Sequence, residues 1–500
     1  MWVGLARYQR HLQREEIRTA LARQGLSLAA GSVSALCDRF LAALEALHWQ
    51  RAPALRAALP HGYPLHIDAT CDKGRGGAFR CLDGWTGWVL HAVRIGSENE
   101  RELRPAVERT VAAFGDPVAI MRDLGQAGAK AVAGCRQRGV PDLLCQYHFL
   151  AAVGHRLLDD SYALLRSQIS RSKVRSRLRA LLRAARSSEG LRPDLPALLL
   201  WVLEAEGRKH LTYPFSLPHL DFFRRCGQFP AERDRRLPRP RSRSELRLLR
   251  QVAEALGELE RLDPQGWASS RLERGWTVFC ELRDVLRLSD RELPGGPRSA
   301  PSAPLQPEAA AARLQAIAAD FQRYHQDLRQ RVAARLTTDG PGTFQPDSIV
   351  LNYLDRYGEG LVGHPVARDT AGRAVAVVDR TNNVIEQSFA VAKQGLRRRL
   401  GRTHLGRDLE DQPAQVALAL AANLQHPDYV QVLCGTLDQL PRAFAALDRQ
   451  EPIGPPRLQR THRNAELRRR NRAWAKDALL CPPLPPASHS QTPPELLVSN

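Results

Sequence analysis

The sequence LHIDATCD, at residues 65–72, decides the fold. Its apolar and polar side chains alternate with a period of two, which predicts a strand with two different faces. Asp68 stands between Ile67 and Ala69, and a carboxylate inside an apolar strand is costly unless it has a partner. We therefore expect Asp68 to bind a cation, with Asp72 on the same face as its rival.

Short apolar segments and helical segments alternate after this strand. The expected strands lie within residues 77–95, 118–124 and 142–149, and the expected helices within 102–114 and 127–139. A three-strand meander followed by parallel strands joined through helices is the plan of the RNase H-like fold. We therefore predict an α/β core with a mixed five-stranded sheet and flanking helices, whose strands end at a shared carboxylate cluster.

The strand pattern stops after His148 for some two hundred residues, which are rich in Leu and Arg at helical spacing. A basic loop at 229–245 and a Pro/Gly/Ser linker at 292–308 interrupt these helices. The expected organisation is a helical DNA-binding region at 1–60, the first part of the core at 61–150, an all-α insertion at 151–377, the second part of the core at 378–425, and a helical, basic region with a disordered Pro-rich tail at 426–500.

The first sixty residues have the outline of a helix-turn-helix. Gly25 offers the turn between two segments whose apolar residues recur at helical spacing. Ser32 and Ser34 then lie near the start of the second helix, where a recognition helix meets the DNA groove. A helical hairpin without any DNA-binding role gives the same pattern and stays open as the alternative.

The charge balance favours a polyanionic partner. Lys and Arg number 73 against 53 Asp and Glu, so the formal net charge is +20, and the pI is near 10.2. Only six of the 73 are Lys, so an arginine-rich genome explains part of the excess. The sequence has neither an apolar run of roughly 18 residues nor a signal-peptide core, and we expect a cytoplasmic, nucleoid-associated protein without a membrane segment.

Two more carboxylates are candidates for the cation site. Asp123 follows an apolar strand and precedes a Gly-containing turn, although a helix-capping Asp gives the same pattern. Glu386 lies on a helix expected at about 384–400, where Asn383 three residues earlier has the spacing of a capping box. Asp379 is its rival. Carboxylates are the ligands that Mg²⁺ prefers, and two such ions about 4 Å apart support phosphodiester cleavage.

Two cations share the helical face of Glu386. Lys393 and Arg397 follow it by seven and eleven residues, close to whole numbers of turns. We expect both to bind phosphates of the DNA backbone beside the metal site. A solvated face is the competing interpretation, and it suits the adjacent Arg398 and Arg399.

Four motifs occur in a familiar order: HIDATC at 66–71, IMRDLGQAGAKAV at 120–132, CQYHF at 145–149 and TNNVIEQSFAVAKQGLRRRLG at 381–401. Together they resemble the DDE transposases of bacterial insertion sequences, particularly the branch related to Mutator-like and hAT elements. The resemblance covers roughly residues 60–150 and 378–425. It implies a homo-oligomeric DNA transposase that uses two Mg²⁺ or Mn²⁺ ions to cleave the ends of its element and join the 3′ hydroxyl to target DNA.

The resemblance also assigns residues. It implies that Asp68, Asp123 and Glu386 are the catalytic metal ligands. Cys145 and His148 match the Cys-x-x-His motif, which implies a buried Cys on a strand and a His that faces the active site near the scissile phosphate. We expect no zinc here, because two ligands fall short of a tetrahedral site.

An aromatic residue of the insertion is expected to stack on a displaced base in related transposases. Trp276 leads Trp201 and Trp267, because Arg271 and Arg274 precede it; packing in the core is the competing role. Two other functions stay open: an RNase H-like nuclease or resolvase that cuts without joining, and a sequence-specific DNA-binding protein with a decayed catalytic core.

Overall fold

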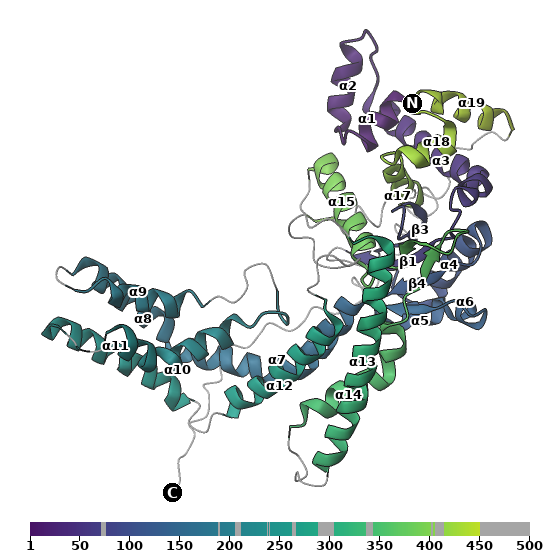
Figure 1. Cartoon of the computed structure of the whole chain (residues 1–500). Coiled ribbons are helices and arrows are strands. Elements are labelled where there is room, and N and C mark those ends of the chain that lie inside the picture. The colour runs from purple at the N-terminus through teal and green to yellow at the C-terminus, as the bar shows by residue number, and fades with distance from the viewer. Residues whose placement is uncertain are drawn as a thin grey trace, which may run out of the picture.

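The computed structural model describes residues 1–71, 77–188, 191–205, 212–237, 239, 241–262, 267–288, 305–336, 344–401, 404–405 and 415–450. Within these ranges the chain is a mixed α/β protein (Figure 1). Asp72 and the expected Pro-rich tail lie outside the described residues. In the described part, no helix is long and apolar enough to cross a membrane.

The sheet has five strands: β1 (Pro64–Cys71), β2 (Gly77–Asp83), β3 (Val89–Ile95), β4 (Ala119–Arg122) and β5 (Asp142–Leu144). Their order is β3-β2-β1-β4-β5. β2 pairs antiparallel with both β1 and β3, whereas β4 pairs parallel with β1 and with β5. The expected mixed five-stranded sheet, a meander followed by parallel strands, is therefore confirmed.

Helices flank the sheet and close its β3 edge: α3 (Ala30–Ala57), α4 (Glu100–Phe114), α5 (Gln126–Ala131), α6 (Ala133–Gln137), α15 (Asn383–Leu400), α17 (Gln415–Asn423), α18 (Pro427–Cys434) and α19 (Leu440–Gln450). α17 lies along β3, where the Asn423 side chain accepts a hydrogen bond from the backbone N–H of Val89 and donates one to its carbonyl. An unpaired edge strand exposes such groups to other chains, so Asn423 protects this edge.

A helical segment follows β5: α7 (Gln146–Ser172), α8 (Val174–Ser187), α9 (Asp194–Leu203), α10 (Pro218–Arg236), α11 (Arg243–Leu262), α12 (Trp267–Leu286), α13 (Pro307–Leu336), α14 (Pro346–Tyr357) and the 3₁₀ helix η1 (Gly358–Leu361). α7 and α12 lie side by side and extend away from the sheet (Figure 1). Phe149, Leu158 and Phe279 are fully buried in a second hydrophobic core between these helices.

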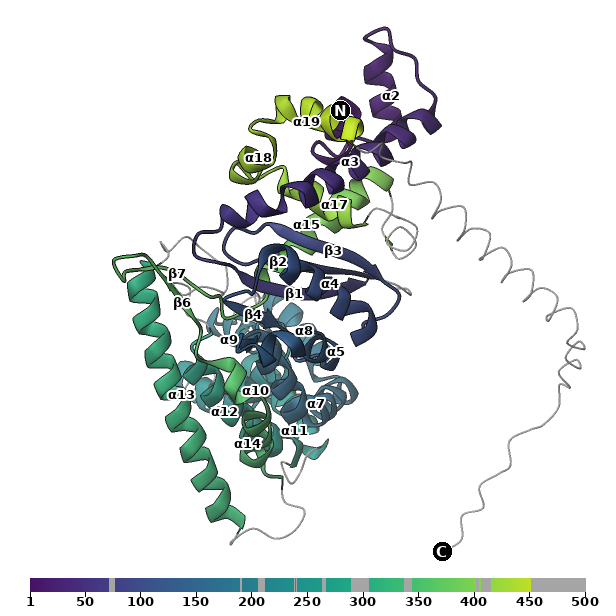
Figure 2. The ribbon, with the colours of Figure 1, turned by 90° about the vertical axis from the view of Figure 1, so that its right-hand side faces the viewer.

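Two expectations about this segment are wrong. The region is not all helical, because β6 (Val366–Arg368) and β7 (Ala374–Val377) form a hairpin that packs against α13 (Figure 2). The carboxylate of Asp369 accepts backbone N–H groups at Ala371 and Arg373, which stabilises the tight turn. The basic stretch at 229–245 is not one loop, because α10 continues through Pro230 to Arg236.

The amino-terminal region is helical, as expected, with α1 (Trp2–Tyr8), α2 (Arg14–Ala22) and α3. Gly25 has a φ of 81°, which suits its turn between α2 and α3. Ser32 is exposed in the first turn of α3, whereas the Ser34 hydroxyl accepts a hydrogen bond from Arg14 and donates one to the Ala30 carbonyl. The helical hairpin is therefore confirmed, and its DNA-binding role stays a prediction.

Candidate active site

Asp68 lies in the middle of the sheet. Its cross-strand partner is Arg80 on β2, but the guanidinium of Arg80 donates to the Ser388 hydroxyl and stacks on the Phe389 ring, both on α15. Asp68 itself accepts a hydrogen bond from the backbone N–H of Ala69 at 2.8 Å. Arg80, the cation nearest to Asp68 in the sheet register, therefore contacts α15.

Burial raises the pKa of Asp68 to about 7, against the opposing effect of the Ala69 N–H, and the carboxylates of Asp123, Glu386 and Glu98 raise it further. All three neighbouring charges are negative, so the ionised form of Asp68 is destabilised by both desolvation and repulsion. The structure thus brings Asp123 and Glu386 close enough to Asp68 to raise its pKa.

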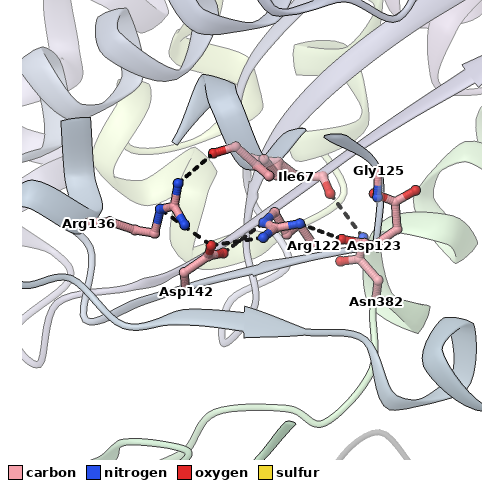
Figure 3. Close-up of polar contacts among 8 residues, drawn as sticks. Ile67, Arg122, Asp123, Gly125, Arg136, Asp142 and Asn382 are labelled. Carbon is pink, nitrogen blue, oxygen red and sulfur yellow. Dashed lines mark hydrogen bonds and ion pairs between the residues drawn. The ribbon is translucent and has the colours of Figure 1, made fainter. Parts of the chain in front are cut away.

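Asp123 follows β4, and its Oδ1 accepts the backbone N–H of Gly125 at 2.9 Å (Figure 3). Gly125, not Asp123, occupies the N-cap position of α5. The adjacent Arg122 donates to the carboxylate of Asp142, at 2.7 Å and 2.9 Å. Arg122 is therefore neutralised by Asp142, whereas Asp123 raises the pKa of both Asp68 and Glu98.

Glu386 lies one turn into α15, which begins at Asn383 with Asn382 as its N-cap residue. The capping-box interpretation is wrong, because the position three residues after the N-cap is Ile385. Asn382 instead fixes the helix to β1: its side-chain amide donates to the Ile67 carbonyl at 2.9 Å (Figure 3). His66 Nδ1 lies 3.0 Å from its Oδ1. Asn382 therefore sets the start of α15 beside Asp68.

Cys145 and His148 do not lie on a strand, contrary to expectation. β5 ends at Leu144, Cys145 is the N-cap residue of α7, and His148 lies in the first turn of that helix. Cys145 is fully buried, as expected, and its sulfur accepts the backbone N–H of Asn382 at 3.2 Å. Cys145 thus has a structural role at the start of α15.

His148 faces the candidate site, as the resemblance implied. Its Nε2 lies 3.7 Å from Glu386 Oε1. That oxygen is buried and accepts no hydrogen bond from any residue that the structure describes. A buried carboxylate oxygen normally has a donor or a cation beside it, and this oxygen, on a side chain that is 39% exposed, can accept a further partner.

The cations of α15 have different environments. Lys393 lies on the same side of the helix as Glu386, and its Nζ donates to the Cys71 carbonyl at the end of β1, at 2.9 Å. Arg397 is exposed. The solvated interpretation is wrong for Arg399, which is 7% exposed. Its guanidinium lies 3.2 Å from His11 Nδ1 and over the Tyr8 ring, so it packs against the amino-terminal helices.

Sequence reasoning missed Glu98. This residue precedes α4, and an added Cβ at Gly125 would lie 2.9 Å from Asp123 Oδ1 and 3.4 Å from Glu98 Oε1. Burial and the charge of Asp123 raise the pKa of Glu98. The helix cap that follows it obscures this position in the sequence, because Asn99 caps α4 by accepting the backbone N–H of Glu102.

The donor set suits a hard divalent cation. In the described ranges, no group of three or more His, Cys, Asp or Glu side chains is already placed to hold a metal ion. The chemistry nevertheless fits Mg²⁺: the charged groups that raise the pKa of Asp68 are all carboxylates, and Glu386 has an oxygen without a donor among the described residues. A cation would also remove the repulsion that raises the pKa of Asp68.

Trp276 packs against the core of the helical segment. Its ring stacks on Phe279 at 5.4 Å between centroids, and the Arg283 guanidinium lies 6.0 Å from it. These contacts favour the packing role over base stacking. Comparison of the sequence with models of known protein families finds no match, and comparison with curated proteins finds none either.

Proposed function

We propose that this chain is a DNA transposase of the DDE type that cleaves the ends of its element and joins them to target DNA. One observation carries the proposal: burial and three neighbouring carboxylates raise the pKa of Asp68 to about 7. Such crowding destabilises the folded chain, and strongly perturbed acids cluster at functional sites.

The arrangement of the core supports the same function. The order β3-β2-β1-β4-β5, with parallel β1, β4 and β5, agrees with an RNase H-like core. Two of the carboxylates come from neighbouring parallel strands, and Glu386 comes from a helix that begins after the long helical segment. The net charge of +20 suits a DNA substrate.

In this mechanism Asp68, Asp123 and Glu386 would hold two Mg²⁺ ions, which when bound would supply activation of the attacking oxygen and stabilisation of the leaving one. Asn382 keeps α15, and therefore Glu386, against β1. His148 Nε2 lies beside Glu386, on the side of the site where the scissile phosphate would bind. Lys393 lies beside Cys71, the last residue of β1, where its ammonium binds a phosphate next to the scissile one.

The test uses duplex DNA from both sides of the coding sequence, incubated with the full chain and Mg²⁺, followed by sequencing of cut and joined products. We expect joined products from the wild type. Asp68→Asn, Asp123→Asn and Glu386→Gln should each lower cleavage on the order of 10³-fold or more while DNA binding is retained, because each removes a metal ligand and no phosphate contact.

Two controls make the test specific. Asp116→Asn changes an exposed acid that pairs with Arg138 away from the site, and it should leave cleavage unchanged. Asp379→Asn tests the rival acid. Cleavage without joining would show a nuclease or resolvase, and DNA binding without Mg²⁺-dependent products would show a DNA-binding protein; either result contradicts the proposal.

A further inference from the structure

A basic hollow lies where α7 ends and α8 begins. It has a volume of about 620 Å³. Its charged and titratable lining residues are Arg166, Arg171, Lys173, Arg175, Arg179 and His219. Among the described residues, neither Asp nor Glu lines it. The hollow therefore gathers five cations without an acid between them.

Three of these cations lack the acidic partners that some arginines of the helical segment have. Arg192 pairs with Glu245, for example, and Arg224 pairs with Glu273. Within the described ranges, no ion pair joins Arg166, Arg171 or Arg179 to an acid. Like charges gathered on one surface repel one another, so an anionic ligand would stabilise the hollow.

Two helix starts add donors to the same place. Ser176 belongs to the first turn of α8, which contains no acidic residue, and His219 belongs to the first turn of α10, which also contains Asp221. The first N–H groups of a helix lack partners within the helix and carry a partial positive charge. Cations, hydroxyls and helix starts of this kind together recognise phosphate groups.

The hollow lies at a defined distance from the candidate active site. His148, in the first turn of α7, is beside Glu386, and Lys173 follows the last residue of the same helix. The two residues are 25 positions apart in the sequence, which corresponds to about 38 Å along a helix axis. One turn of B-DNA measures about 34–36 Å, so a duplex presents the same face again after roughly that distance.

The geometry points to a second DNA contact: the hollow binds backbone phosphates of the duplex about one helical turn from the phosphate that is cut. This inference rests on the proposed function and deepens it. α7 acts as the spacer, with the scissile phosphate at its first turn and the distal phosphates at its last (Figure 1). Binding here is independent of sequence, because it involves only the backbone.

The test compares Arg171→Ala/Arg179→Ala with Arg183→Ala/Arg186→Ala, which removes two exposed arginines of α8 outside the hollow. Binding of duplexes of about 8 and about 20 base pairs is measured in EDTA by fluorescence anisotropy over a range of salt. The shorter duplex is about 27 Å long and does not span both sites. Circular dichroism verifies that each variant is folded.

We expect the wild type to bind the longer duplex more tightly and with a log-log salt slope steeper by about two. The hollow variant should lose that difference and bind the longer duplex roughly 10-fold more weakly at physiological salt. Arg171→Lys/Arg179→Lys, which conserves charge, should restore it. A difference that persists in the hollow variant, or an equal loss in the α8 control or on the shorter duplex, would overturn the inference.

The two proposals fail separately. Joined products together with an unchanged salt slope in the hollow variant would reject the second contact alone. A flattened slope without any Mg²⁺-dependent product would reject the transposase and leave a phosphate-binding hollow.

Discussion

Two acids of this chain, the buried Glu245 and the partly buried Asp68, have opposite environments. Glu245, at the start of α11, accepts hydrogen bonds from the Arg192 guanidinium and from the backbone N–H groups of Arg192 and Arg241. Burial alone would raise its pKa, but these donors outweigh burial and lower it. Asp68 has one backbone donor and three acidic neighbours, and its pKa is raised. Burial is common to both acids, and the partners decide the direction.

This is the difference expected between a structural acid and an acid that binds a cation. In the helical segment Glu245 is matched by Arg192, so loss of either partner leaves the other charge uncompensated. An acid left among other acids costs stability and is expected where a cation must bind during function. Charge pairing in the folded chain, more than burial, identifies the site.

The largest effect on stability is expected for Asp68→Asn, which removes the unfavourable charge. The folded pKa, about 7, exceeds the usual value of 3.8, so the native chain binds more protons between these values and loses stability as pH rises through this window. The gain from the substitution should be near zero below pH 4 and reach roughly 2–4 kcal/mol above pH 7.

Urea unfolding of the wild type and of Asp68→Asn in EDTA, at intervals from about pH 4 to pH 8, measures this gain. Asp142→Asn is the matched control. It removes an acid that forms an ion pair with Arg122, whereas Asp68→Asn removes an unpaired acid. It should lower stability. A gain for Asp68→Asn that is constant across pH, or a loss at pH 8, would contradict the account of the acid cluster.

A loss of about 3 kcal/mol is expected for Glu245→Gln, because it leaves the Arg192 guanidinium without its partner. Cleavage per folded molecule should be unchanged, since Glu245 lies in the helical segment that follows β5. Thermal or urea unfolding together with the cleavage assay measures both. A stable Glu245→Gln protein with impaired cleavage would remove the distinction between the two classes of acid.

Local patterns were sufficient for the sheet and its acids. The period-two alternation around Asp68 and the strand before Asp123 are properties of short segments. Glu386 and Lys393 lie on the same side of α15 because helical geometry is regular. Contacts between distant segments were not predictable in this way. Neither the packing of Arg399 against Tyr8 nor the bond from Asn382 to Ile67 follows from spacing along the chain.

Element boundaries and overlapping signals explain the remaining errors. Cys145 directly follows the apolar strand β5 and caps α7, so the apolar pattern predicts a strand through His148, although His148 lies in the first turn of the helix. Glu98 was overlooked because the following cap, Asn99 to Glu102, accounts for the local polar residues without it. The short β6–β7 hairpin has too few residues for a clear alternation.

The smallest effects are expected on α15, where acids and cations meet. Lys393→Ala and Arg397→Ala should each weaken DNA binding similarly for all sequences and flatten the log-log salt slope by roughly one, because each removes one phosphate contact. Arg398→Ala is the matched control: Arg398 is adjacent and exposed but points to another side of the helix. Fluorescence anisotropy from low to physiological salt measures the slopes. If Lys393→Ala and Arg397→Ala kept the wild-type slope, these side chains would face water, and only the carboxylates of α15 would belong to the site.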